Sequence, residues 1–182
     1  MTETWVREVL AFWFEETTPE QWFRKDDAFD ATLRARFLPL HERLQVRPIE
    51  DFLGDAETAI AAIVMFDQMS RNMFRGTARA FASDQRALAL AEAAIARGYE
   101  AKLSKPQRQF LYLPFEHAED LAAQERCVAL MRSLDDAELV KWAEAHRVII
   151  ARFGRFPHRN QALGRASTAE EIAFLKEPGS SF

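Results

Sequence analysis

Apolar residues recur with a helical period along most of the chain. At about 100° per residue, the apolar side chains between positions 5 and 13 share one face of a first helix that is expected to end near Glu16. The same periodicity predicts further helices at 18–23, 29–39, 56–74, 83–95, 116–131 and 135–153, with a short last one after Thr168.

Local start and stop signals support these helices. Ser83 is a favourable N-cap for a helix that stops at Gly98, and Thr168 with Glu171 forms the pattern of a capping box. Pro114 is expected to break the chain between a turn opened by Pro106 and the following helix. No alternating strand pattern with hairpin turns is present. The chain is therefore predicted to be all-α, an antiparallel helical array of roughly seven to nine helices.

Length and composition favour one compact domain. The chain has 182 residues, and domains commonly have roughly 100–200. We expect a single domain over residues 1–178 and a frayed tail over 179–182. The net charge of −4 argues against a nucleic-acid-binding surface. The single cysteine, Cys127, the absence of a signal peptide and the lack of an apolar run of about 18 residues indicate a cytoplasmic protein with no membrane span.

Polar residues interrupt the core-facing stripes of three predicted helices. Each of these stripes is otherwise apolar, and burying an unpaired charge costs several kcal/mol. The interrupting residues are Asp67, Arg71, Arg75, His117, Gln124 and His146.

Two interpretations of these residues stay open. Asp67 and Arg71 are four residues apart, with the acid first, and could pair with each other as a purely structural contact. A single buried histidine is likewise more often structural than functional. Three helices that all point hydrogen-bonding groups inward, however, are typical of a site built between facing helices.

A basic loop follows the predicted helix 135–153. Positions 147–165 contain five arginines and no Asp or Glu. Gly154 and Pro157 favour a fixed loop conformation, and the planar guanidinium of arginine suits carboxylate or phosphate. The structural alternative is that the arginines cover helix C-termini and pair with acidic residues such as Glu116, Glu119 and Asp120.

These features resemble the bacterial domain of unknown function 924 family. Residues 66–77 read FDQMSRNMFRGT, residues 81–84 read FASD, and residues 110–119 read FLYLPFEHAE. The segment 152–160, RFGRFPHRN, with Leu163-Gly164-Arg165 and Thr168, and the pairs and triplets FWF at 12–14, WF at 22–23 and FD at 29–30 complete the pattern. Ser70 and Ala118 stand where the family pattern has Pro and Ser. The resemblance implies an all-helical fold similar to tetratricopeptide repeats and no assigned biochemical role.

The first functional hypothesis is a site for a small anionic ligand, phosphate or carboxylate. The arginines would hold the anion, while His117, His146 or Asp67 would orient it and supply any acid–base chemistry. No nucleophile motif or phosphate-binding loop is present, so the sequence assigns no reaction and no cofactor. The predicted ligand-binding residues are Asp67, Arg71, Asn72, Arg75, Glu116, His117, Gln124, His146, Arg155, His158, Arg159 and Asn160.

Two other hypotheses belong to different classes. A tetratricopeptide-like groove could receive an acidic peptide on its arginines. Alternatively, the polar residues could form a buried network that only fixes the packing. A metal site is disfavoured, because Glu116, His117, Glu119 and Asp120 are neighbours on a predicted helix and point in different directions.

Overall fold

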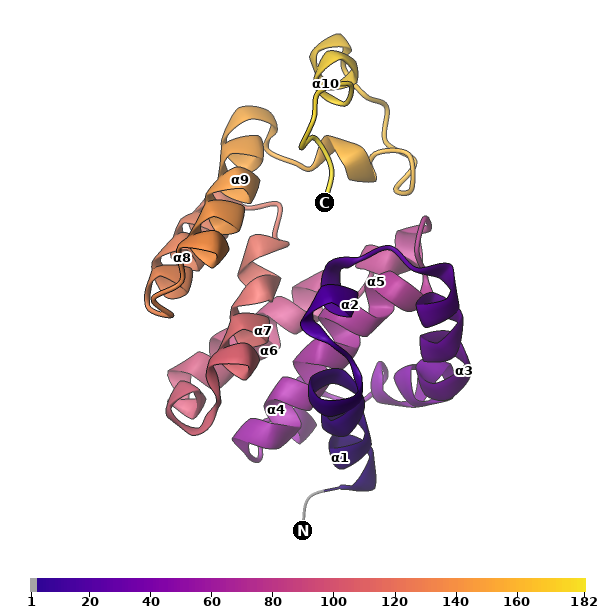
Figure 1. Cartoon of the computed structure of the whole chain (residues 1–182), viewed down its shortest axis with the longest axis vertical. Coiled ribbons are helices and arrows are strands. Elements are labelled where there is room, and N and C mark those ends of the chain that lie inside the picture. Colours follow the sequence, from indigo (N-terminus) through magenta and orange to yellow (C-terminus); the bar gives the residue numbers. More distant parts are fainter. Residues whose placement is uncertain (1–2) are drawn as a thin grey trace. The chain divides into compact units, whose positions relative to one another are not determined.

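The computed structural model describes residues 3–182, and every regular element in that part of the chain is helical (Figure 1). No strand occurs among residues 3–182, so the predicted all-α fold class is confirmed. Helix α4 (Ala56–Ile63), the π-helical turn η3 (Val64–Met69) and α5 (Ser70–Met73) follow one another without a break. The ten α-helical segments of the described chain therefore form nine separate helices, within the predicted range.

The chain divides into two compact units. Unit 1 contains the residues up to Arg75 together with Arg79–Pro114, and unit 2 contains Gly76–Ala78 and Phe115–Phe182. The boundary falls inside helix α7 (Lys105–Glu116), directly after Pro114. The single domain over residues 1–178 and the similarity to tetratricopeptide repeats stay predictions.

Unit 1 is organised around the continuous helix α4–η3–α5, which contacts α1, α3 and α6. This helix is the most apolar stretch of the sequence, and almost all of its side chains are buried. The other elements of the unit are α1 (Thr4–Ala11), the π-helical turn η1 (Phe12–Glu16), α2 (Pro19–Phe23), α3 (Asp27–Leu44), the 3₁₀ turns η2 (Ile49–Phe52) and η5 (Tyr99–Lys102), α6 (Asp84–Ala96) and α7 up to Pro114. The 3₁₀ turn η4 (Ala78–Phe81) begins in unit 2 and continues in unit 1.

Unit 2 is a helix pair with a long C-terminal loop. Helix α8 (Leu121–Arg132) packs along α9 (Ala137–Phe153). The loop after α9 contains the 3₁₀ turn η6 (Pro157–Arg159) and leads to α10 (Ala169–Phe174). Ile149, Ile150 and Phe156 form a small buried core against which Phe153 and Phe174 pack.

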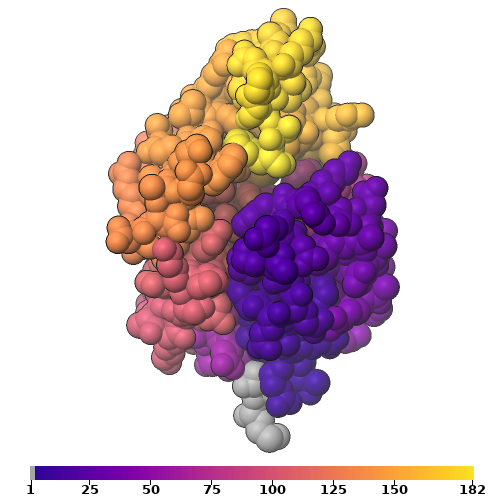
Figure 2. Space-filling model, in the orientation of Figure 1, coloured from indigo at the N-terminus to yellow at the C-terminus, as the bar shows by residue number. Residues whose placement is uncertain are grey.

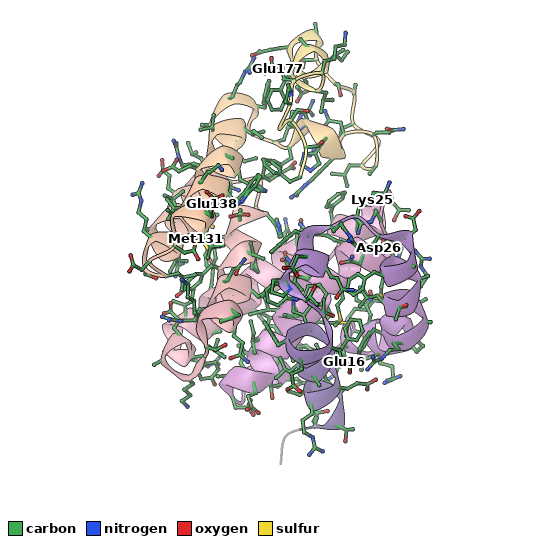
Figure 3. All side chains as sticks on the ribbon, in the orientation of Figure 1. Glu16, Lys25, Asp26, Met131, Glu138 and Glu177 are labelled. Atoms are coloured by element: carbon green, nitrogen blue, oxygen red, sulfur yellow. The ribbon has the colours of Figure 1, made fainter. Side chains whose placement is uncertain are left out.

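Side-chain caps begin several helices, whereas the predicted N-cap of α6, Ser83, forms no side-chain cap hydrogen bond. The carboxylate of Asp26, labelled in Figure 3, accepts two backbone N–H hydrogen bonds at the start of α3. Asp136 does the same for α9, and Gly154 ends that helix with a positive φ of 68°. Thr168 and Glu171 form the predicted capping box of α10. These caps satisfy backbone groups that a helix end leaves without partners.

Two prolines lie inside helices, contrary to the sequence prediction. Pro39 does not end its helix, because α3 continues to Leu44 and thereby buries Leu40 and Leu44. Pro114 lies within α7, and the break comes later, at 117–120. The predicted helix 116–131 is therefore wrong at its start: His117 lies in the connection to α8 and shares no helix with Gln124.

Candidate functional site

A buried ion-pair network surrounds Arg71 in unit 1. The Asp67 side chain is fully buried in the π-helical turn η3, which is an arrangement often found at functional sites. Arg71 donates to the backbone carbonyl of Asp67 over 2.8 Å and lies 3.4 Å from Asp67 Oδ1. It also holds both carboxylate oxygens of Asp84, at 2.8 and 2.9 Å. The predicted Asp67–Arg71 pair is thus present. The shorter contacts of Arg71 with carboxylate oxygens, however, are those with Asp84.

A second buried carboxylate, Asp30, binds Asn72 and Arg75. Arg75 donates from Nε over 2.5 Å and from Nη2 over 2.9 Å, and Asn72 Nδ2 donates over 2.7 Å. Burial by itself would raise the pKa of Asp30, but the hydrogen bonds from Arg75 and Asn72 outweigh it and lower the pKa. Both predicted arginines of unit 1 therefore bind carboxylates of their own unit in a two-pronged geometry.

The basic loop of unit 2 is likewise held by internal ion pairs. Arg155 donates to both oxygens of Glu171, at 2.7 and 2.8 Å, and to the carbonyl of Ala166. Arg165 holds Glu119 over 2.6 and 2.9 Å. The Arg155 hydrogen bond lowers the pKa of Glu171 to about 2. Arg155, which was predicted to hold a ligand, therefore fixes the loop onto the capping box of α10.

His146 differs from these charged groups because it is buried in the neutral form. The residue is 6% exposed on helix α9, and burial lowers its pKa to about 3. Nδ1 lies 2.9 Å from the carbonyl oxygen of Trp142, which can only accept a hydrogen bond. Nδ1 therefore carries the proton, and Nε2 is left as the acceptor nitrogen. Because the ring is neutral, its 3.5 Å contact with Glu116 Oε1 is not an ion pair.

Rings from three parts of unit 2 gather around His146. The His117 and Phe156 rings lie 6.3 and 5.7 Å from it, and the Phe182 ring stacks on it with centroids 3.6 Å apart. The guanidinium of Arg159, itself buried, lies 4.4 Å from the centroid of Phe156.

Two buried polar residues of α8, Gln124 and Cys127, contact the end of α7 and the connection that follows it. Gln124 is fully buried and donates to the carbonyls of Phe115, Glu116 and Ala118, so it closes the α7–α8 connection. Cys127 Sγ lies 3.9 Å from Glu116 Oε2. Burial, together with Glu116, raises the pKa of the Cys127 thiol, which makes it a poor nucleophile.

The predicted site residues fall in both units. Asp67, Arg71, Asn72 and Arg75 belong to unit 1, where Arg71 and Arg75 bind different carboxylates. The remaining eight belong to unit 2 and are Glu116, His117, Gln124, His146, Arg155, His158, Arg159 and Asn160. Asn160 Nδ2 donates to Ser167 and to Glu171, so it supports the loop together with Arg155. A single ligand site made of all twelve residues stays a prediction.

Several important residues were missed from the sequence. Asp30 and Asp84 lie in the FD and FASD motifs and were not considered as partners of the arginines. Glu119 is one of the acidic residues expected to pair with the basic loop, and Arg165 holds it, whereas the sequence predicts Glu171 only as part of the capping box. Phe182 carries no signal in the sequence that would connect it with His146.

Two classes of feature are not found in the described residues. Within residues 3–182, no group of three or more His, Cys, Asp and Glu side chains is arranged to hold a metal ion. In the same part of the chain, no helix combines the length and the hydropathy that crossing a bilayer requires.

Comparison with known proteins supports the family resemblance that the sequence motifs indicate. The model of the family "Bacterial protein of unknown function (DUF924)" matches residues 9–179. The chain belongs to this family. A solved structure of a protein of unknown function from Agrobacterium tumefaciens is 42% identical to it, with a TM-score of 0.88 over 94% of this chain and 96% of the other. This DUF924 member matches no curated protein.

Proposed function

We propose that unit 2 binds a small anionic ligand next to His146. The observation that carries the proposal is the fixed tautomer of this residue: Nδ1–H is used by the Trp142 carbonyl, and burial keeps the ring neutral with its pKa at about 3. At neutral pH, Nε2 can then accept a hydrogen bond from an O–H or N–H group of a ligand. With its pKa at about 3, the imidazole is a weak base, so its role in this proposal is to orient a ligand and not to take up a proton.

Positive charge near His146 favours an anion over a cation. After burial, the influences that lower the pKa of His146 include the positive charge of Arg159, which arginine keeps at any ordinary pH. An anionic group placed beside Arg159 would be stabilised by the same charge. Arg159 is 5% exposed, and its interactions are therefore only weakly screened by solvent.

Arg71, Arg75 and Arg155 are not proposed to hold the anion. Arg71, Arg75 and Arg155 each hold both oxygens of a carboxylate. A ligand that bound to one of them would have to displace that carboxylate and leave it buried without its partner, which is costly. The proposal therefore rests on His146 and the residues near it.

Thermal unfolding at neutral pH in the presence of phosphate or citrate, which each carry an O–H group, tests the proposal, and sulfate and acetate, which carry none, are the comparison. A ligand at about 100 times its Kd stabilises the folded protein by about 2.7 kcal/mol. For a chain of this size, that raises the Tm by about 2–4 °C per kcal/mol. We expect the shift in the wild type and its loss in His146→Phe.

His41→Phe is the matched control, because His41 is also a buried histidine with a lowered pKa but lies in unit 1. It should keep the full shift wherever it folds, and Arg159→Gln provides a second loss variant. A shift that survives in both His146→Phe and Arg159→Gln would refute the proposal. Binding of an aspartate-rich peptide without any effect of His146→Phe would instead support the peptide-binding alternative.

A further inference from the structure

The last residues of the chain return to helix α9. After α10, Gly179 has a positive φ of 77°, which suits glycine. Ser180 is buried, and its hydroxyl donates to the carbonyl of Leu175 over 3.2 Å, while its N–H donates to Glu177, labelled in Figure 3, over 3.3 Å. In Figure 2 the C-terminal segment, in yellow, lies beside orange residues of the same unit. The fraying of residues 179–182 stays a prediction beside these contacts.

Phe182 lies among three other rings. It stacks on His146 with an interplanar angle of 20°, while Trp142 and His158 meet it edge-on with centroids at 6.4 and 6.0 Å. The two edge-on contacts have a favoured geometry of aromatic pairs, and the 3.6 Å centroid distance places Phe182 almost face to face on the imidazole. The three residues therefore define a position that fits one planar ring.

The ring in that position is open to solvent on one side. Phe182 remains 48% exposed, although His146 beneath it is buried. The anchor of the segment is Ser180, two residues earlier, so Phe182 can leave while Ser180 keeps its hydrogen bond to Leu175. The position is thus occupied by a side chain that can move away without unfolding helix α10.

We infer that the ligand of the His146 site carries a planar aromatic ring beside its anionic group, and that Phe182 occupies the ring position until the ligand displaces it. This inference rests on the function proposed above. The ring would stack on His146 in place of Phe182, and the anionic group would lie toward His158 and Arg159. The ligand class is therefore a small aromatic carboxylate.

Displacement has a quantitative consequence. A ligand that binds only when Phe182 has moved away has its Kd increased by the inverse of the fraction of open molecules. Removing the Phe182 ring makes every molecule open. Affinity for the aromatic anion should then increase, whereas the enclosure of the site by other residues is unchanged.

Calorimetric titration with phenylacetate, cyclohexylacetate and acetate tests the inference on the full chain. We expect phenylacetate to bind more tightly than the other two, and Phe182→Ala to bind it roughly threefold or more tightly than the wild type. Phe23→Ala, which removes another exposed phenylalanine in unit 1, is the matched control and should leave the Kd unchanged.

The outcomes separate this inference from the proposed function. Equal binding of phenylacetate and acetate, or weaker phenylacetate binding by Phe182→Ala, would overturn the aromatic ligand and its competition with Phe182, while the anion site would stand. If none of these three carboxylates nor inorganic phosphate binds to the wild type or to Phe182→Ala, both proposals fail.

Discussion

Each unit of the protein buries one histidine, and the two residues are held in opposite ways. In unit 1, His41 Nε2 lies 3.0 Å from Ser70 Oγ, whose own proton goes to the carbonyl of Met65. The serine oxygen must therefore accept, and His41 carries its proton on Nε2. His146 in unit 2 carries its proton on Nδ1 instead, and its ring face is covered by Phe182.

The comparison shows that burial does not by itself make a histidine a site. Burial lowers the pKa of both residues, to about 4 for His41 and about 3 for His146. His41 is enclosed by the Phe66 and Phe74 rings, which belong to the body of its unit. His146 is covered by a half-exposed residue near the end of the described chain. Two properties therefore distinguish a candidate site: the residues that cover the histidine ring, and the ring nitrogen that remains able to accept a hydrogen bond.

The largest expected effect on stability comes from the buried ion-pair network around Arg71 in unit 1. Arg71→Ala should lower the free energy of unfolding by about 3–5 kcal/mol, because it leaves buried carboxylates without their main cation. Urea-induced unfolding measures this loss. The control is Arg36→Ala, which breaks the exposed pair with Glu16 and should cost less than about 1 kcal/mol. Similar losses for both variants would contradict the structural role of the network.

A smaller effect is expected at the basic loop of unit 2. Arg155→Ala removes both hydrogen bonds to Glu171 and should cost about 1–3 kcal/mol in unfolding free energy. The pKa of Glu171, about 2 in the folded protein, lies below its ordinary value of 4.5, so its stabilisation is complete above pH 4.5 and is lost as the pH falls toward 2. The gap between wild type and variant should close over that range.

Arg152→Ala is the matched control for the loop. It breaks the exposed pair with Glu170 in the same unit and should cost less than about 1 kcal/mol. A Tm for Arg155→Ala equal to that of Arg152→Ala would return Arg155 to the list of residues available for a ligand.

The pH dependence of stability compares the two histidines directly. Both folded pKa values lie below the ordinary 6.5, so the unfolded chain takes up protons first as the pH falls. Stability is therefore complete above pH 6.5 and declines toward about 4 for His41 and about 3 for His146. Each residue should contribute up to about 1.4 kcal/mol per pH unit.

Urea titrations between pH 7 and 5 measure that slope. His41→Gln and His146→Gln should each remove one histidine's share of it, and the double variant should remove both. A wild-type slope that neither substitution reduces would show that these histidines titrate normally in the folded protein.

The last prediction needs no substitution, because it is tested by spectra of the wild-type protein. Long-range ¹H–¹⁵N correlation spectra at neutral pH should show a proton on Nε2 for His41 and on Nδ1 for His146. No change in stability is involved, so the result is independent of whether any variant folds. The same tautomer for both residues would remove the distinction on which the His146 proposal depends.

The sequence by itself determined much of this protein. Helical periodicity and cap chemistry act over a few residues, so the all-α class, the capping box at Thr168 and the end of α9 at Gly154 could be predicted. The inward position of Asp67 and of His146 followed from the same periodicity.

Only the tertiary structure decided which carboxylate each arginine binds. Asp30 and Arg75 are 45 residues apart in sequence, and Arg155 and Glu171 are 16 apart, so no local pattern connects them. The helices around Pro39 and Pro114 continue, although proline disfavours helix, because they bury side chains beyond the proline. The contact of Phe182 with His146 depends on how the segment after α10 folds back within unit 2. Pairing and covering of this kind are set by distances in space, which a hydrophobic pattern does not encode.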